Sequence, residues 1–440
     1  MADVGTLKIQ CFSGDSYIPV DNSKILIRNP QGEEVKTTVS LVTDSSGTTN
    51  VVELPAPLLE YSQSPSENLP YSLYNIVVQR AGFKDVIING TQIFPNRLAF
   101  QKINLSEAST RQEAIENINI LPNTLNGDYP NKIPENPDKP LPPPSSGVVL
   151  AQPVVPEYIT VHSGGPNDTS AQNYKVLYKD YLKNVASCEI YSTWSDSTIR
   201  ANIYCIISFT LNRIYTEWYR GKGKNFDITN STAFDHAFNY GRNTYDSIDK
   251  VVDEIFSTYI KRVNKKQPLL TQYCDGNKVS CPDWLSQWGS KTLGDQGEVP
   301  YDILTHYYGD DIELTTAEKV SGSPSSYPGH ELKVGDSSES VRMAQEFLNR
   351  ISNNYPLIPK VAVDGNYTDA TEQAVKVFQG VFNLPQTGVI DYATWYKISD
   401  VYVGVSKIAE LRGGNVFYPP MTDFRVREKS DIPCFRYPTN

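Results

Sequence analysis

The sequence predicts a multidomain protein with an N-terminal all-β sandwich, a central α+β domain and a small C-terminal α-helical domain. Three observations support this fold class. The chain has 440 residues, which is too long for one hydrophobic core, since domains usually hold about 100–200 residues. Its hydrophobic period changes from the alternation of strands to the spacing of helices. A proline-rich stretch separates the first part from the rest.

Short alternating segments predict a β-sandwich in residues 1–120. Apolar and polar residues alternate in Leu7–Phe12, Lys24–Arg28 and Tyr74–Gln79. Turn-forming residues such as Asn29-Pro-Gln-Gly stand between these segments. Short strands joined by polar turns are typical of a sandwich, and we find no catalytic set of side chains in this part.

Residues 121–156 are expected to form an extended linker that separates two folded parts. Prolines stand here among Asn, Asp, Lys and Ser, at positions 130, 134, 137, 140, 142, 143 and 144. Such a composition favours extended conformations and leaves the backbone open to proteases.

The central domain is expected to span residues 157–325. Asn173–Asn184 reads as an extended segment followed by a helix start. Apolar residues at helical spacing predict helices over Ser197–Arg220 and Asp246–Arg262, and a short helix over Pro300–Tyr308.

Residues 331–402 are expected to form the helical domain. Apolar spacing predicts helices over Ser340–Ile351, Thr371–Gln379 and Thr394–Ile398, with glycines at the turns between them. Residues 403–440 are aromatic and proline-rich without a clear period, so they are a C-terminal tail to which the sequence assigns no role.

Charge and hydropathy exclude some classes of protein. The formal net charge is −10, which disfavours a nucleic-acid partner because no basic surface is available for phosphates. No apolar run approaches the roughly 20 residues that a membrane span needs, so no membrane partner is expected. The first residues lack the basic and apolar regions of a signal peptide, and synthesis in a cytoplasm without such a signal is expected.

The cysteines and histidines show no metal or disulfide pattern. Six cysteines are scattered along the chain. Cys274 and Cys281 could pair around one loop, but free thiols are the expectation for a protein without a signal peptide. No Cys-x-x-Cys pair and no His cluster with zinc spacing is present, so neither a metal nor another cofactor is expected.

The stretch with the most chemical information runs from Tyr181 to Trp194 and ends before the predicted helix at Ser197. Its sequence, with Glu189 before a Ser/aromatic turn and a long helix, resembles the core signature of the stage II sporulation protein D family. Two further stretches resemble that family in the same order: a looser middle match at 226–232 and 235–241, and a closing motif at 285–290 and 299–309.

That family consists of lytic transglycosylases, and the resemblance implies that Glu189 is the catalytic acid. Cleavage of a glycosidic bond needs a proton for the leaving oxygen, and a carboxyl group in an apolar setting can hold one. A solvated glutamate in a turn is the alternative. The substrate-contact candidates are Ser286, Gln287, Trp288, Tyr191, Trp194 and His236, although Trp288 could equally be part of the core.

Two departures from the family pattern are visible. The family's long helix carries an arginine where this sequence has Ile207, Ser208 and Phe209. Many members bind zinc near the middle segment, where this chain offers only His236, so no zinc is expected.

The C-terminal part resembles the peptidoglycan-binding type 1 domain. The matching sequences are Leu332–Asp336, Val341–Asn349, Val363–Tyr367, Thr371–Gln379 and Thr387–Trp395, in the family order. Four side chains could face the glycan, although a role in the core or in a turn is the commoner one for each: Asp364, Tyr367, Gln379 and Trp395.

The order of these parts resembles the clostridial spore cortex-lytic enzymes. The resemblance implies synthesis in the mother cell, storage at the boundary of cortex and coat, and action on cortex peptidoglycan in germination. It also implies that residues 1–120 are a pro-domain and that a subtilisin-like Csp protease cuts the linker, which we expect between Gly147 and Gln152. An N-acetylmuramoyl-L-alanine amidase and a non-enzymatic wall-binding protein are the alternatives.

Overall fold

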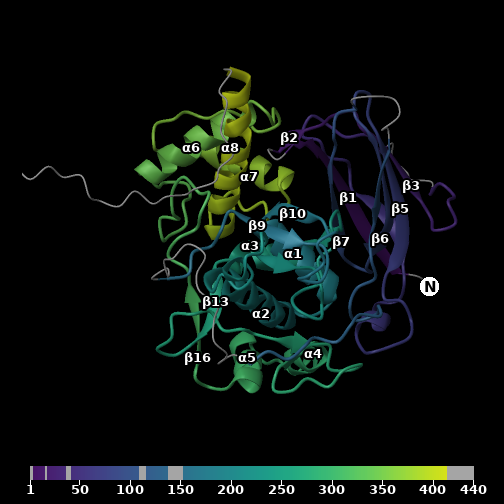
Figure 1. Ribbon diagram of the computed structural model, residues 1–440. Helices are drawn as coiled ribbons and strands as arrows, with labels where there is room; N and C mark the ends of the chain where they lie inside the picture. The colour runs from purple at the N-terminus through teal and green to yellow at the C-terminus, as the bar shows by residue number, and fades with distance from the viewer. Residues whose placement is uncertain (1–2, 15–16, 36–40, 109–114, 137–151, 414–440) are drawn as a thin grey trace, which may run out of the picture.

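The computed structural model describes residues 3–14, 17–35, 41–108, 115–136 and 152–413 (Figure 1). A β-rich N-terminal module precedes a central module of helices and short sheets, and a C-terminal module of three helices follows. In Figure 1 the central module lies below the other two, which contact each other, for example where Lys8 Nζ donates to Asn383 Oδ1 at 2.9 Å. Residues 137–151, which hold most of the expected protease site, and residues 414–440 lie outside the described residues.

The N-terminal module contains two sheets that share one buried core. In the first sheet β1 pairs in parallel with β7 and antiparallel with β2 and β4, and in the second β5 lies between β3 and β6. The strands are β1 (Asp3–Ser13), β2 (Ile18–Pro19), β3 (Lys24–Arg28), β4 (Val52–Ala56), β5 (Ser72–Gln79), β6 (Asp85–Ile93), β7 (Leu98–Asn104) and β8 (Ile115–Asn119). Alternate residues of β1, such as Leu7 and Ile9, are fully buried, so this part is β-rich as predicted.

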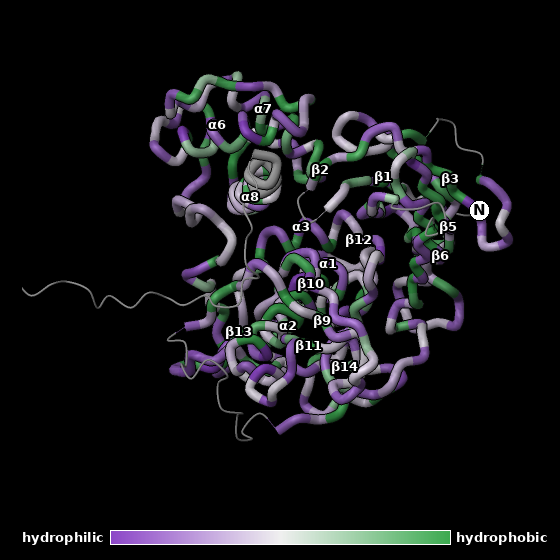
Figure 2. The backbone as a smooth tube through the Cα atoms, turned by 45° about the horizontal axis from the view of Figure 1, so that its top comes forward, coloured by the Kyte–Doolittle hydropathy of each residue, from purple (hydrophilic) through white to green (hydrophobic). Residues whose placement is uncertain are grey.

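The central module is built around two buried helices, α1 (Tyr178–Glu189) and α2 (Asp196–Tyr215). Apolar residues fill the middle of α2, which crosses the module's interior (Figure 2). The remaining helices are α3 (Asp246–Ile255), α4 (Gln287–Asp295) and α5 (Pro300–Tyr308), with 3-10 turns η2 (Leu59–Ser62) and η3 (Arg220–Lys222) elsewhere in the chain. The strands are β9 (Tyr158–His162), β10 (Asn173–Leu177), β11 (Ile228–Thr229), β12 (Thr244–Tyr245), β13 (Thr258–Arg262), β14 (Tyr273–Cys274), β15 (Leu285–Ser286) and β16 (Ile312–Thr316).

Two helices of the central module end earlier in the structure than the sequence predicted. The helix expected over Asp246–Arg262 ends at Ile255, and Thr258–Arg262 is instead strand β13, antiparallel to β16. The Thr-Tyr-Ile run alternates as a strand does, and the Ile260 N–H donates to the Ser208 hydroxyl at 2.7 Å. Helix α2 stops at Tyr215, five residues before Arg220, and Glu217 then adopts a φ of +47°.

The C-terminal module contains α6 (Glu339–Ser352), α7 (Asp369–Val381) and α8 (Tyr392–Gly413). The first two agree with the predicted helices. The third is much longer than expected, so the boundary placed between residues 402 and 403 falls inside a helix. Tyr392 fixes α8 to the central module, since its ring packs on Phe256 and its hydroxyl lies 2.6 Å from that of Ser257.

Residues 121–136, called here the covering segment, are not an open linker. They lie against the central module along their whole length. The Asn123 amide is fully buried and donates to the carbonyls of Ser187 and Ile190. The Ile133 N–H donates to the Ala233 carbonyl at 2.7 Å. The proline content predicted an extended chain. It gave no sign that the segment packs on the central module, because the residues that it contacts lie far away in the sequence.

The N-terminal and central modules share a core instead of meeting through a tether. Strand β12 pairs with β7 and so adds a strand of the central module to the first sheet. Phe94 packs on Tyr191 and Tyr245 with ring centroids 5.4 and 5.2 Å apart. The Trp194 indole N–H donates to the Ser62 carbonyl at 3.0 Å. The two modules therefore bury aromatic surface and satisfy polar groups for each other.

This interface predicts that the two fragments of a cleaved chain stay associated. If an engineered protease site within residues 137–151 is cleaved, we expect both pieces to elute together in size-exclusion chromatography, because the β7–β12 pairing and the buried rings remain. Light scattering should report the mass of the uncut chain, and denaturing gels should show two fragments. Phe94→Ala should weaken this association, whereas separate elution of the wild-type pieces would show that the interface is too weak to hold them.

Candidate functional site

Glu189 is the last residue of α1 and faces a cavity of about 300 Å³. The cavity walls come from residues distant in sequence: the covering segment on one side, and Asp235, Tyr273 and Gln287 among those on the other. The cavity is therefore assembled only when the covering segment packs on the central module. It is large enough to admit part of a sugar ring or several water molecules.

The Glu189 carboxyl group is almost completely buried, with 3 % of the residue exposed. Oε1 accepts a hydrogen bond from the Ala237 N–H at 2.6 Å. Burial raises the pKa of Glu189, while the charge of Lys132 and contacts with Tyr273 and Ala237 lower it by less. Its position at the C-terminal end of a helix also disfavours a negative charge there. Burial therefore favours the protonated form of this carboxyl group, the form that a general acid needs.

Gln287 is the predicted contact residue that the structure brings to Glu189. It is buried, lines the same cavity, and its Nε2 donates to the Glu189 carbonyl at 3.1 Å. The neighbouring residue Ser286 caps helix α4. The Ser286 hydroxyl accepts a hydrogen bond from the Gly289 N–H at 2.9 Å. Ser286 does not line the cavity.

The three predicted aromatic contacts lie in the core. Tyr191, Trp194 and Trp288 are at most 8 % exposed and pack on one another with centroids 5.1–5.8 Å apart. None of them lines the Glu189 cavity. The structure therefore places them away from the cavity, and their large apolar rings join the N-terminal and central modules.

His236 is fully buried beside the site without lining the cavity. Its Nδ1 lies 3.0 Å from the Tyr181 hydroxyl, and its ring stacks on that of Tyr273 at 5.7 Å. Burial and the charges of Lys132 and Arg213 lower its pKa well below the usual value. The imidazole is thus neutral near pH 7, and the structure places it behind Tyr273 and not in the cavity wall.

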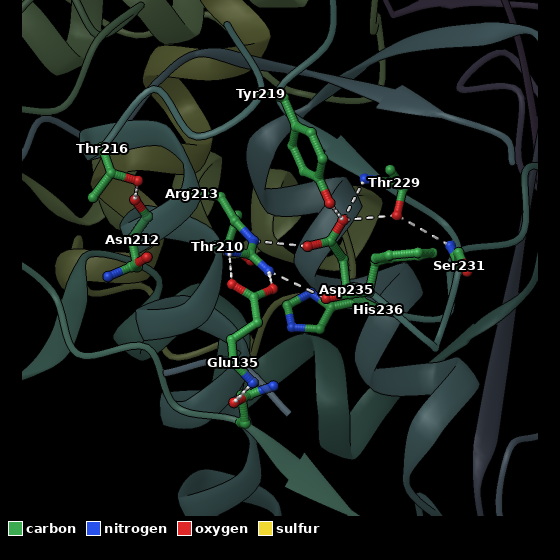
Figure 3. A network of polar contacts seen from close by, with 12 residues as sticks. Glu135, Thr210, Asn212, Arg213, Thr216, Tyr219, Thr229, Ser231, Asp235 and His236 are labelled. Atoms are coloured by element: carbon green, nitrogen blue, oxygen red, sulfur yellow. Dashed lines mark hydrogen bonds and ion pairs between the residues drawn. The ribbon is translucent and has the colours of Figure 1, made fainter. Parts of the chain in front are cut away.

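A buried ion pair fixes the loop that carries Ala237. Arg213 Nε donates to Asp235 Oδ1 at 2.8 Å, with the arginine side chain 1 % and the aspartate 0 % exposed. The other Asp235 oxygen accepts from the Tyr219 hydroxyl and from the N–H and hydroxyl of Thr229 (Figure 3). This carboxylate is fully satisfied, so Asp235 lines the cavity as a fixed structural charge.

Glu135 of the covering segment completes the pairing of Arg213. Both its carboxylate oxygens accept from the arginine, one from Nη1 at 3.1 Å and the other from Nη2 (Figure 3). A bidentate pair of this kind is directional and strong. The same guanidinium therefore holds two separate stretches of chain, the Asp235 loop and the covering segment.

Cys274 and Cys281 form a disulfide with a Cα–Cα separation of 5.7 Å, so the expectation of free thiols is wrong. The loop between them is closed by Asp275, whose carboxylate accepts from the N–H groups of Lys278 and Val279. This turn brings the two cysteines within bridging distance. The spacing of the two cysteines was compatible with a disulfide, but the lack of a signal-peptide pattern in the first residues favoured free thiols.

The predicted glycan contacts of the C-terminal module are mostly structural. Tyr367, Gln379 and Trp395 are 2, 1 and 3 % exposed, so the structure places them in the core of the module and not on its surface. Their polar atoms are bonded internally, as in the Tyr367 hydroxyl donating to the Gly388 carbonyl at 2.7 Å. Asp364 is exposed, but its carboxylate accepts from the Asn366 N–H and so shapes a turn.

The sequence did not single out four residues that act on the Glu189 site: Lys132, Arg213, Asp235 and Tyr273. Arg213 lies on the predicted long helix, and the apolar residues around it on that helix were a signal that it could be buried. Lys132 gave no signal, because it stands among prolines in a stretch that reads as a linker.

The described residues hold neither a membrane-spanning helix nor a cluster of metal ligands. None of the helices in the described ranges is both long and apolar enough to cross a bilayer. Within those same ranges, no three His, Cys, Asp or Glu side chains gather as a metal site would require.

Comparisons with known proteins identify one part of the chain. No curated protein matches it. The minor pilin GBS52 of Streptococcus agalactiae is 14% identical over 25% of this chain and 47% of the pilin, with a TM-score of 0.18. The major pilin BcpA of Bacillus cereus is 13% identical over 27% of this chain and 28% of the pilin, with a TM-score of 0.14. This chain thus spans less than half of either pilin, and the scores are too low to bear on the fold. Residues 337–398 match the family described as a putative peptidoglycan binding domain, so the C-terminal module is a peptidoglycan-binding domain.

Proposed function

We propose that this protein is a spore cortex-lytic enzyme of the SleC type, a lytic transglycosylase that cleaves peptidoglycan between muramic acid and glucosamine. The observation that carries the proposal is the Glu189 carboxyl group, which is buried at a cavity with its pKa raised by burial. The peptidoglycan-binding domain supports the choice of substrate, since it would hold the enzyme on the wall.

The proposed reaction uses Glu189 twice. Its proton goes to the glycosidic oxygen as the bond from that oxygen to the anomeric carbon breaks. The muramic acid 6-hydroxyl then attacks the anomeric carbon, and its proton returns to Glu189. The product carries an anhydro-muramic end, and no water is consumed.

The other carboxylates that line the cavity suit this one-acid mechanism. Asp235 is fully engaged by Arg213, Tyr219 and Thr229, and Asp275 accepts two backbone hydrogen bonds in its turn. Asp128 belongs to the covering segment. A glycosidase with a carboxylate nucleophile would need a second acidic group facing the same sugar.

The proposal includes a zymogen made in the mother cell, stored at the boundary of cortex and coat, and cut by a subtilisin-like Csp protease at germination. The position of the covering segment supports it, because this segment closes one side of the Glu189 cavity and precedes the expected cut. A non-enzymatic wall-binding protein is the second candidate, favoured by the peptidoglycan-binding domain alone.

Glu189→Gln tests the catalytic assignment. The amide preserves the shape of the side chain but cannot donate the proton, so release of soluble fragments from cortex peptidoglycan should fall by about 100-fold or more in the cut protein. Glu346→Gln on the exposed face of α6 is the control and should retain full activity.

Mass spectrometry of the released fragments distinguishes the candidate functions. Anhydro-muramic ends support the transglycosylase, whereas free stem peptides would indicate an amidase. A protein that binds the wall and releases nothing, in the uncut and the cut form alike, would be the wall-binding protein.

Truncation of the chain before Glu331, which removes all of α6, α7 and α8, tests the role of the peptidoglycan-binding domain. We expect the truncated chain to sediment poorly with insoluble cortex peptidoglycan. Its melting temperature should also fall, because Phe256 loses its contacts with Tyr392 and Tyr396. Circular dichroism confirms that the rest is folded, and equal sedimentation of both chains would contradict the anchoring role.

A further inference from the structure

We propose that the Cys274–Cys281 disulfide is a redox-dependent positioning element of the Glu189 site. When closed, the disulfide fixes one wall of the cavity, and when reduced, it releases that wall. The inference rests on the proposed function, because the activity that it would control is the one proposed for Glu189. It concerns residues 273–287, called here the bridged loop.

The bridged loop supplies a large part of the cavity lining. The residues of this loop that line the cavity with Glu189 are Tyr273, Cys274, Asp275, Lys278, Val279 and Gln287. One of the two disulfide-bonded residues is therefore itself part of the wall, so any change in how the disulfide holds the loop reaches the cavity directly.

Both ends of the bridged loop meet at a short pair of strands beside Glu189. Strand β14, which contains Tyr273, pairs in parallel with β15 over two residues. The residue after β15 is Gln287, whose Nε2 donates to the Glu189 carbonyl at 3.1 Å. The Tyr273 ring stacks on that of His236 with centroids 5.7 Å apart. A pairing of only two residues on each strand is weak by itself, so the position of both side chains depends on the loop that joins the strands.

The two halves of the bridged loop are held differently. In the first half, the Asp275 carboxylate accepts from the N–H groups of Lys278 and Val279, and the Asp275 carbonyl accepts from the Trp288 N–H at 3.1 Å. In the second half, residues 280–283 are largely exposed, and within the described ranges no hydrogen bond joins them to another part of the chain. The disulfide therefore supplies a tie that hydrogen bonds do not.

A reductant can reach the disulfide more easily than the other described cysteines. Both bonded cysteines are only partly buried, whereas the free Cys11, Cys188 and Cys205 are buried. Burial raises the pKa of each of these three thiols. A protonated thiol is a poor nucleophile, so these three do not compete for the bonded sulfur atoms.

Reduction of the disulfide is a two-electron reaction. A dithiol, or a pair of small-molecule thiols, breaks the sulfur–sulfur bond. Each cysteine sulfur takes up one electron and one proton, and the reductant gives up two of each as it forms its own disulfide. In the proposed route the chain is made in a cytoplasm, where thiols are kept reduced. The wall of the Glu189 cavity would then be fixed only after the chain has left that compartment.

Reduction of the folded wild type tests the structural part of the inference. After treatment with dithiothreitol, with the new thiols counted by a thiol reagent, the amides of Lys278, Val279 and Trp288 should exchange hydrogen at least tenfold faster. The amide of Ile203, in the buried middle of α2, should exchange at an unchanged rate and so report that the central module stays folded. Unchanged exchange at all four amides in fully reduced protein would overturn the inference.

Fragment release from cortex peptidoglycan by the cut protein tests the link to the site. The double variant Cys274→Ser with Cys281→Ser should release fragments at least tenfold more slowly than the oxidised wild type, because small displacements of a site lower its rate strongly. The double variant is also the matched control for the reductant. Dithiothreitol should slow the wild type and leave the double variant unchanged, and reoxidation should restore the wild type.

A redox titration distinguishes positioning of the site from a general loss of stability. In mixtures of reduced and oxidised dithiothreitol, fragment release should follow the fraction of closed disulfide, with the same midpoint and the slope of a two-electron couple. Circular dichroism should show no unfolding over this range. A loss of release that follows a loss of the circular-dichroism signal instead would overturn the positioning role.

These readouts separate failure of the inference from failure of the proposed function. If the exchange result is as expected but the oxidised wild type releases no fragments, the disulfide holds the wall and the proposed function is wrong. If oxidised and reduced wild type release fragments equally fast, the function stands and the inference is overturned.

Discussion

Asp235 has no exposed surface, and its charge is stable there only because Arg213, Tyr219 and Thr229 donate to both of its oxygens. Loss of one partner of such a buried pair typically costs about 3–5 kcal/mol, since the other charge stays buried and unpaired. This pair fixes the loop from which the Ala237 N–H reaches Glu189 and from which two carbonyls receive the covering segment. The geometry of the site thus depends on an interaction that takes no part in the proposed chemistry.

Opposing influences meet at Glu189. Burial and the end of α1 favour its neutral form, and Lys132 with the Ala237 N–H favours its ionised form. Lys132 is subject to the same burial, which lowers its pKa in turn. Burial outweighs the charge of Lys132, so the pKa of Glu189 stays above its ordinary value with the ammonium group in place.

The sequence indicated the helical and strand character of each module, because these follow from local periodicity in residues such as Leu7, Ile9 and the apolar positions of α2. It also singled out Glu189 and Gln287, through motifs that are continuous in the chain. It did not show which contacts join distant segments. Tyr191, Trp194 and Trp288 fit a substrate-binding pattern as well as a core pattern, and contacts such as the packing of Phe94 on Tyr191 place them in the core. Lys132 could not be found, since a lysine among prolines reads the same whether it lies in solvent or above a buried glutamate.

The contacts that build the central module are also those that close its cavity. Asn123 and Thr124 cap carbonyls at the end of α1, which would otherwise be buried without partners, and the same stretch begins the wall over Glu189. Displacing the whole segment would therefore expose those carbonyls to solvent or to the incoming glycan, which carries hydroxyl and amide donors of its own.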